Sequence, residues 1–239
     1  RPEPAPESAF SNWQPPPELG SPFRNCPHRD FTRESERRGF AGAVAHLPAA
    51  FPIAVPVVIS GKRREGAEVH RRLSPNGGQT CVAEVQMAGV PDAEDAVRAA
   101  LAAWPAWRDR DVRDRAMLLE RLAASLLKDR DRLATLQVHE VAKPWAEADA
   151  DVAEAIDFCR YYARQALEEL GPRALGEVPG ERNELRFEGR GPTVVIAPWN
   201  FPLAILCGMT TAALVGGNTV IMKPAEQSSA IGYALYRHL

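Results

Sequence analysis

The chain has 239 residues, of which 45% are hydrophobic and 25% charged, and its formal net charge is -2. These values are typical of a globular protein with one large domain or two small ones. The near-neutral charge gives no reason to expect nucleic acid or an anionic membrane as a partner. No apolar run approaches the ~20 residues that a membrane-spanning helix needs.

The four cysteines, Cys26, Cys81, Cys159 and Cys207, are far apart and form no CxxC pair. Isolated thiols indicate a reducing compartment rather than a disulfide framework, so we expect a cytoplasmic protein. The histidines have no metal-ligand spacing, and no metal site is predicted.

Both ends of the sequence suggest a piece of a longer protein. The first residue is Arg1 rather than methionine, and Leu239 falls inside a helical pattern without a stop signal. Residues 1–27 hold many of the prolines, including Pro15-Pro16-Pro17, and predict an extended linker. With a short helix over residues 33–47, N-capped by Thr32, this lead-in ends near residue 50.

Residues 51–239 are predicted to form an α/β domain. Residues 53–60, 69–73 and 81–87 are β-rich and are separated by turn signals, which indicates a small antiparallel unit. Residues 184–188 alternate and predict an edge strand.

Three long helices are expected between these β segments. The first covers residues 92–104 with Asp92 as its N-cap, the second residues 109–143, and the third residues 146–170. Cys159 falls in the apolar stripe of the third helix, so we interpret it as a core residue and not as a nucleophile.

A strand over residues 193–197, a helix over 203–214 and a strand over 219–222 complete the predicted elements. They fit within about 30 residues, the size of a βαβ crossover in a parallel sheet. Ligands in such sheets bind beyond the carboxyl ends of the strands. The segments at those ends are Pro198-Trp199-Asn200-Phe201 and Lys223-Pro224-Ala225-Glu226, and we expect the site there.

Asn200 is the candidate catalytic residue. Its side-chain amide can donate a hydrogen bond to an oxygen that gains negative charge, as in an oxyanion hole. The alternative is that Asn200 only caps the following helix.

Glu226 and Lys223 are candidate cofactor ligands. A carboxylate at this position can accept hydrogen bonds from ribose hydroxyls and repels a 2′-phosphate, which favours NAD over NADP. The ammonium adds a donor to the same sugar. The alternative is an ordinary exposed ion pair, and Ser228 or Ser229 is interpreted as the N-cap of the next helix.

The motif Pro198-Trp199-Asn200-Phe201-Pro202, followed by Gly217-Asn218-Thr219-Val220 and Lys223-Pro224-Ala225-Glu226, resembles the NAD(P)-dependent aldehyde dehydrogenase superfamily. The resemblance implies an aldehyde-dehydrogenase-like α/β fold, with a Rossmann-type parallel sheet, flanking helices and a small antiparallel β-flap, incomplete at its C-terminus. Residues 51–239 would be the N-terminal part of the NAD-binding domain. The family also places Ile196, Pro198 and Trp199 along the cofactor.

The resemblance extends upstream to a subgroup. Residues 23–32 resemble the lead-in of 1-pyrroline-5-carboxylate dehydrogenases. Residues 58–62, 138–148 and 156–163 resemble segments that occur in the same order in the family. Residues 223–227 look most like those of bifunctional proline-utilisation enzymes, so the Pro-rich start could follow an upstream proline dehydrogenase domain.

By this resemblance the full protein oxidises L-glutamate γ-semialdehyde to L-glutamate with NAD. A cysteine thiolate attacks the aldehyde, Asn200 helps to hold the oxyanion, and a glutamate base activates water. The cysteine and the base would lie beyond this chain, which alone is expected to be inactive. Family members form homo-oligomers through the flap, to which residues 69–87 and 184–188 would contribute.

Two other readings stay open at this point. The chain could be a non-catalytic nucleotide-binding or assembly module, although half a parallel sheet would expose a bare apolar edge. It could also belong to an aldehyde dehydrogenase with another substrate, because most substrate-binding loops fall outside these residues.

Overall fold

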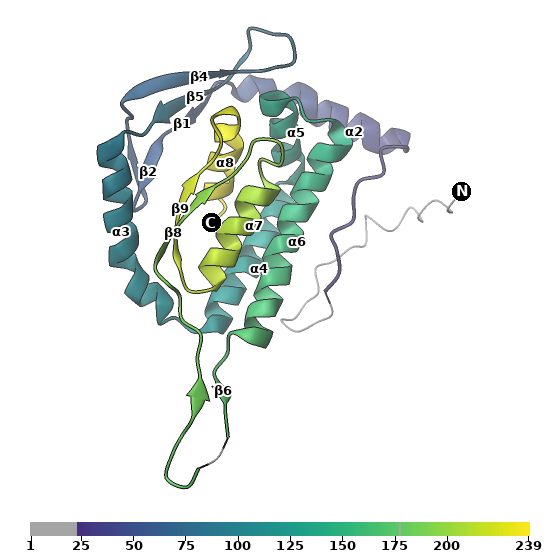
Figure 1. The fold of residues 1–239 in the computed structure, drawn as a ribbon. Coiled ribbons are helices and arrows are strands. Elements are labelled where there is room, and N and C mark those ends of the chain that lie inside the picture. Colours follow the sequence, from purple (N-terminus) through teal and green to yellow (C-terminus); the bar gives the residue numbers. More distant parts are fainter. Residues whose placement is uncertain (1–22, 177) are drawn as a thin grey trace.

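The computed structural model describes residues 23–176 and 178–239 (Figure 1). The helices are α2 (Glu34–His46), η1 (Leu47–Ala50), α3 (Val90–Arg108), α4 (Val112–Lys128), α5 (Arg130–Val141), α6 (Trp145–Glu169), α7 (Ala204–Val215), η2 (Glu226–Ser228) and α8 (Ser229–Tyr236). The strands are β1 (Ile53–Val55), β2 (Val57–Ile59), β3 (Lys62–Arg64), β4 (Glu68–Leu73), β5 (Cys81–Met87), β6 (Arg173–Ala174), β7 (Glu184–Leu185), β8 (Pro192–Ile196) and β9 (Thr219–Lys223).

The predicted βαβ unit is confirmed. Strands β8 and β9 pair in parallel, with Val194 opposite Ile221 and Ile196 opposite Lys223, and α7 connects them. Their boundaries lie within a residue or so of the predicted ones. Both α3 and α7 contact this pair of strands. The carboxyl ends of β8 and β9 therefore meet at one edge.

Helices α4, α5, α6 and α7 pack beside the strands as a helical layer (Figure 1). The prediction of one helix over residues 109–143 is wrong, because the chain turns at Asp129 between α4 and α5. No glycine or proline marks this break in the sequence. The predicted apolar face is nevertheless correct, since Leu119, Leu126 and Leu133 are fully buried.

Helix α6 runs through the centre of this layer. Val152, Ile156 and Cys159 are fully buried, as the apolar stripe predicted. The Cys159 Sγ lies 3.5 Å from the Cys207 Sγ of α7, and burial raises the pKa of the Cys159 thiol well above its usual value. Both cysteines are packing residues.

The upstream β segments differ from the predicted antiparallel unit. Strand β5 pairs antiparallel with β4, as expected, but parallel with β1, while β2 and β3 form a separate hairpin. Asp92 is not the N-cap of α3. It is the third residue of the helix, and its carboxylate accepts a hydrogen bond from the N–H of Gly89, which is the N-cap.

The two segments suggested for the flap lie in separate sheets. Residues 69–87 belong to the β1-β5-β4 sheet, whereas β7 pairs with β6 in a ribbon that projects from the opposite end of the molecule (Figure 1). The strand predicted over residues 184–188 is shorter, Glu184–Leu185.

The lead-in packs along α5 and α6. The N–H of Cys26 donates to Asp157 at 2.7 Å, and the N–H of Arg29 donates to Asp149 at 2.7 Å. Thr32 does not cap α2: its hydroxyl donates to Asp30 at 2.6 Å, and the N-cap is the next residue. The Pro-rich linker predicted before residue 23 lies outside the described residues.

Candidate functional site

The structure brings all six candidate residues to the same edge of the β8–β9 pair. Ile196 ends β8 directly opposite Lys223, which ends β9, and the N–H of Ala197 donates to the Lys223 carbonyl at 3.4 Å. The loops that follow carry Pro198, Trp199 and Asn200 on one side and Glu226 on the other. In-register parallel pairing thus places the two loops side by side.

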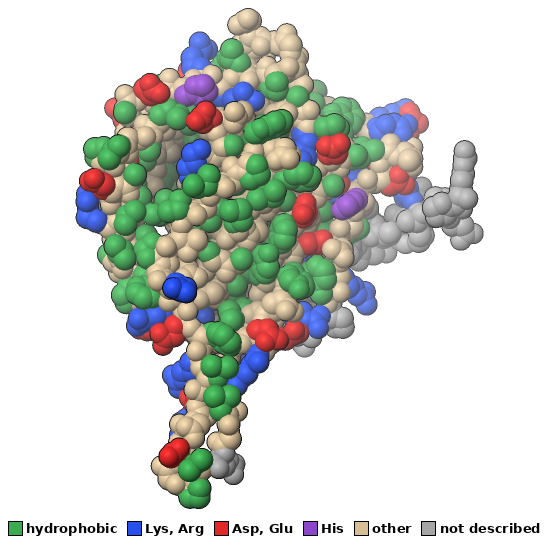
Figure 2. All heavy atoms as spheres, in the orientation of Figure 1, with side chains coloured by type: hydrophobic (Ala, Val, Ile, Leu, Met, Phe, Trp, Pro, Cys, Tyr) green, Lys and Arg blue, Asp and Glu red, His purple; other side chains and the backbone are tan. Residues whose placement is uncertain are grey.

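All six side chains are exposed, with Ile196 at 65% and Trp199 at 52% relative exposure. Val194 and Phe201 are exposed as well. Figure 2 shows hydrophobic side chains gathered over this face of the molecule, where β8, β9 and α7 lie. The candidate residues therefore line an open, largely apolar face and not an enclosed cavity.

The loop that carries Asn200 is fixed from the buried side. The Lys143 ammonium donates to the main-chain oxygen of Asn200 at 2.5 Å. The Asp151 carboxylate accepts from the N–H groups of Leu203 and Ala204 at 3.1 and 3.3 Å. Because Leu203 is the N-cap of α7 and Asp151 binds the first N–H groups, the alternative that Asn200 caps this helix is wrong.

The loop that carries Glu226 is fixed in a similar way. The fully buried Glu140 carboxylate accepts from the N–H groups of Ala230 and Ile231 at 2.7 and 2.9 Å, at the start of α8. Ser228 occupies the predicted N-cap position, but its hydroxyl points to the Ala225 carbonyl at 3.5 Å and does not cap the helix. Glu140 supplies the cap instead.

Burial shifts the pKa of both capping carboxyls upward. The pKa of Glu140 rises to about 7 because desolvation outweighs the two backbone hydrogen bonds. The pKa of Asp151 rises to about 6 for the same reason, although the nearby Lys143 ammonium acts in the opposite direction. Each carboxyl is thus poised to change its protonation near neutral pH.

Lys223 and Glu226 do not form the ion pair that was the alternative interpretation. In the part of the chain that the structure describes, no salt bridge within 4.0 Å joins the two side chains, and both are exposed. Their ammonium and carboxylate groups remain accessible to a polar ligand.

Lys143, Asp151 and Glu140 were not identified from the sequence. Asp151 offered a signal, because it lies four residues before Ala155 and eight before Cys159 and so shares the buried face of α6. A carboxylate on an apolar face requires a partner. The partner groups are backbone N–H groups more than 50 residues away, which no local pattern indicates.

Three of the four cysteines lack the features of a nucleophile, and the half-buried Cys81 lies in β5, outside the site. Cys26, Cys159 and Cys207 are buried, and burial raises the pKa of the Cys26 and Cys159 thiols, whereas a nucleophile needs a lowered pKa and access to substrate. Within residues 23–176 and 178–239 there is no group of three or more His, Cys, Asp or Glu side chains suited to a metal ion. Over the same residues, no helix is long and apolar enough to cross a membrane.

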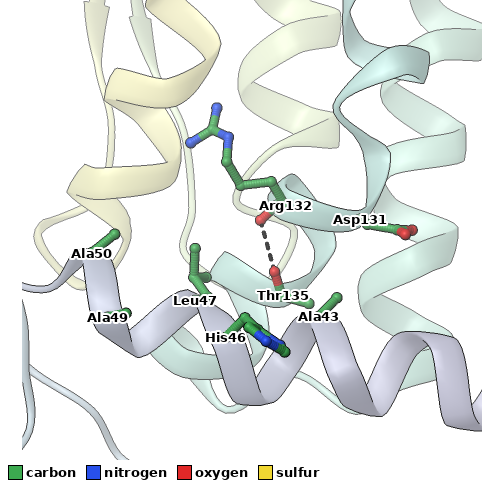
Figure 3. A pocket seen from close by; sticks show the side chains of 8 residues that line it. All are labelled: Ala43, His46, Leu47, Ala49, Ala50, Asp131, Arg132 and Thr135. Atoms are coloured by element: carbon green, nitrogen blue, oxygen red, sulfur yellow. Dashed lines mark hydrogen bonds between the residues drawn. The ribbon is translucent and has the colours of Figure 1, made fainter.

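A pocket of about 510 Å³ lies between α2, η1 and α5 (Figure 3). The Thr135 hydroxyl is engaged with the Arg132 carbonyl at 3.1 Å, and the Arg132 guanidinium turns toward Asp129. No candidate residue lines this pocket, so it is separate from the site. Its lining consists of Ala43, His46, Leu47, Ala49, Ala50, Asp131, Arg132 and Thr135.

Several curated proteins that are similar to the chain are named 1-pyrroline-5-carboxylate dehydrogenase. A 1-pyrroline-5-carboxylate dehydrogenase of Bacillus pumilus (strain SAFR-032) is 39% identical over 213 residues, which are 89% of this chain and 41% of that protein. The 1-pyrroline-5-carboxylate dehydrogenase 2 of Bacillus subtilis (strain 168) is 37% identical over 213 residues, with the same coverage of 89% and 41%. The chain thus spans about 41% of the length of these relatives.

Solved structures agree with the observed fold. Proline utilization A from Bdellovibrio bacteriovorus, inactivated by N-propargylglycine, superposes with a TM-score of 0.87 at 44% identity, over 93% of this chain and 23% of that one. A 1-pyrroline-5-carboxylate dehydrogenase from Thermus with bound NAD superposes with a TM-score of 0.86 at 40% identity, over 91% of this chain and 42% of that one. The predicted aldehyde-dehydrogenase-like α/β fold is confirmed.

Residues 63–239 match the model described as the Aldehyde dehydrogenase family, which covers both site loops and all six candidate residues. The resemblance inferred from the Pro198-Trp199-Asn200-Phe201-Pro202 and Lys223-Pro224-Ala225-Glu226 motifs is therefore confirmed. The chain belongs to the aldehyde dehydrogenase family.

Proposed function

We propose that the complete protein oxidises L-glutamate γ-semialdehyde to L-glutamate with NAD, as a 1-pyrroline-5-carboxylate dehydrogenase. The observation that carries the proposal is the pairing of Ile196 with Lys223, which brings the loop with the exposed Asn200 amide and the segment with the exposed Lys223 and Glu226 side chains to one sheet edge. The shared name of the relatives supports the substrate. In this proposal residues 51–239 contribute part of the NAD-binding domain.

The residues present fit NAD chemically. Glu226 and Lys223 offer an accessible acceptor and donor for ribose hydroxyls, and neither is engaged with the other. Ile196, Pro198 and Trp199 extend this surface with exposed apolar side chains. When bound, NAD accepts the hydride that leaves the substrate carbon.

Asn200 is proposed to donate its side-chain amide to the oxygen that becomes negative when a thiolate adds to the aldehyde. Because the described cysteines are buried or outside the site, the thiolate is proposed to come from beyond these residues, as is the glutamate base. This chain then contributes one wall of the site: an oxyanion donor and a cofactor-binding edge.

The test is the substitution Asn200→Ala in the complete protein. Loss of one oxyanion donor lowers kcat by about 10²–10³-fold, and the NAD dissociation constant should stay within about twofold because Asn200 does not touch the ribose-binding groups. Gln165→Ala on α6 removes an amide remote from the site and serves as control. Unchanged turnover in Asn200→Ala would reject the oxyanion role. Higher kcat/KM for an unrelated aldehyde would reject the substrate.

We also propose homo-oligomer formation through the β6–β7 ribbon. Leu175 is 64% exposed and Phe187 is 51% exposed on this projection, and apolar side chains on a protruding ribbon favour a protein interface. Leu175→Glu should lower the oligomer mass in light scattering. An unchanged mass would count against the ribbon.

We also propose an upstream domain and a cellular compartment for the complete protein. Similarity to proline utilization A supports an upstream proline dehydrogenase domain in the same chain, and the intact mass of the natural protein tests it. The widely separated cysteines favour the cytoplasm, a reducing compartment, which cell fractionation tests.

A further inference from the structure

Lys143 lies in the short connection between α5 and α6, and its side chain is only 5% exposed. Its ammonium donates to the main-chain oxygen of Asn200 at 2.5 Å and stands 4.0 Å from the centroid of the Phe201 ring. An ammonium removed from water is costly unless it is bound by acceptors or negative charge. This one is placed directly beneath the loop that carries the oxyanion donor.

Asp151 approaches the same loop from α6 and has no exposed side-chain surface. Its Oδ2 accepts from the N–H groups of Leu203 and Ala204, while its Oδ1 lies 3.9 Å from the Lys143 Nζ. The charge on Asp151 therefore faces both the ammonium and the positive end of α7.

Together the two side chains hold the loop at both of its ends. Lys143 fixes the carbonyl of Asn200, and with it the plane of the peptide bond that joins Asn200 to Phe201. Asp151 fixes the N–H groups three and four residues later. The exposed Asn200 side chain therefore projects from a backbone whose orientation is set by contacts on the buried side.

A buried ion pair contributes little net stability compared with well-packed apolar residues, but it can specify one conformation. The demands of an oxyanion hole are geometric, because the donor must sit close to where the oxygen develops charge. A loop of this kind benefits from a rigid support more than from an increase in stability.

We propose that Lys143 and Asp151 are positioning residues that orient the Asn200 amide toward the reacting oxygen. The proposal rests on the oxyanion role of Asn200 in the proposed function. Neither side chain reaches the open face, so both act through Asn200 and not on the substrate.

The test is a double-mutant cycle in the complete protein, with Lys143→Met, Asn200→Ala and the double variant. Lys143→Met should lower kcat at least about tenfold with NAD affinity within about twofold, since a misplaced donor is nearly as harmful as an absent one. In the Asn200→Ala background the same change should lower kcat less than about twofold, because there is no longer an amide to position. Lys143→Arg, which keeps the charge, should recover part of the lost kcat.

Glu140→Gln provides a matched control. Glu140 is also a buried carboxylate that caps a helix, but it holds α8 and not the Asn200 loop. Any effect of Glu140→Gln on kcat should be the same in the presence and absence of the Asn200 amide. If Lys143→Met does not fold, Asp151→Asn takes its place in the cycle, since it is isosteric and removes the negative charge that faces the Lys143 ammonium.

The outcomes separate the two proposals. If Asn200→Ala leaves kcat unchanged, the oxyanion role and the positioning role both fall. If Asn200→Ala lowers kcat strongly but Lys143→Met costs the same factor in both backgrounds, the oxyanion role stands and the positioning role is overturned.

Discussion

Arg130 and Asp149 form a buried ion pair with two parallel contacts, Nε to Oδ1 at 2.7 Å and Nη2 to Oδ2 at 2.6 Å. Their side chains are 6% and 1% exposed. Arg130 also donates to the carbonyl of Pro27 at 2.9 Å, and Asp149 also accepts from the N–H of Arg29. The pair therefore joins the lead-in to α5 and α6.

Asp149→Asn should lower the free energy of unfolding by about 3–5 kcal/mol, because it leaves the Arg130 guanidinium buried without its counter-charge. Urea denaturation measures the change. Glu34→Gln is the control, since its ion pair with Arg38 is solvent-exposed and should contribute less than about 1 kcal/mol. Equal, small losses in the two variants would show that the buried pair adds no stability.

Glu140 predicts a specific pH dependence of stability. Its pKa rises from 4.5 in the unfolded chain to about 7 in the fold. Between these values the folded protein holds a proton that the unfolded chain has released, so the contribution of Glu140 to stability is greatest below pH 4.5 and is lost as the pH rises through 7. The loss attributable to Glu140 is roughly 3 kcal/mol.

Glu140→Gln should remove this contribution, so that the parent loses roughly 3 kcal/mol more than the variant as the pH rises across the window. Denaturation curves at several pH values test it. Glu154→Gln, at an exposed position of α6, should keep the parent profile. Parallel profiles for the parent and Glu140→Gln would contradict the assignment.

Gly232→Ala should displace the segment after β9 that carries the proposed cofactor ligands, although Gly232 is not one of these ligands. A Cβ at Gly232 would lie 2.7 Å from the Cβ of Pro224, which must move, and Pro224 adjoins Lys223. We expect NAD binding to weaken several-fold and stability to fall by about 1–3 kcal/mol from overpacking. Calorimetric titration with NAD measures the first effect.

Gly42→Ala on α2 is the control for this substitution. A Cβ there meets nothing within 4 Å, so the change should stabilise the helix by up to about 1 kcal/mol and leave NAD binding unaltered. If Gly232→Ala behaved in the same way, the Pro224 contact would not restrain the loop.

Glu226→Ala should weaken NAD binding by about tenfold or more, since hydrogen bonds to a charged group contribute about 1.5–3 kcal/mol. The preference for NAD over NADP should narrow, because the carboxylate that repels the 2′-phosphate is gone. Titrations with both nucleotides measure this, with Glu154→Ala as a control. Superimposable curves for Glu226→Ala and the parent would remove Glu226 from the site.

Local patterns predicted the part of the fold that depends on local sequence. The period of α6 identified Cys159 as a core residue, and the β-branched runs around α7 identified β8 and β9. Parallel pairing then followed from the length of the connection, and it brought Asn200 and Glu226 to one edge. These inferences needed only neighbours within about 30 residues.

Contacts between residues far apart in the chain could not be predicted from the sequence. The parallel pairing of β1 with β5 depends on which edge is free in the folded sheet, and the turn at Asp129 carries no helix-breaking residue. The partners of Glu140 and Asp151 lie 52 to 91 residues away along the chain. Such features depend on tertiary contacts, and the local patterns of a single sequence do not predict those contacts.

The caps of α7 and α8 also constrain the order in which the protein can assemble. During synthesis the ribosome releases Glu140 and Asp151 before the backbone groups that they bind at Leu203 and Ala230. Until those residues emerge, a nascent helical layer would carry two carboxyls at buried positions without the backbone N–H donors that bind them. We therefore expect helices α4 to α6 to complete their packing only after residues 203–231 have emerged, together with the two site loops.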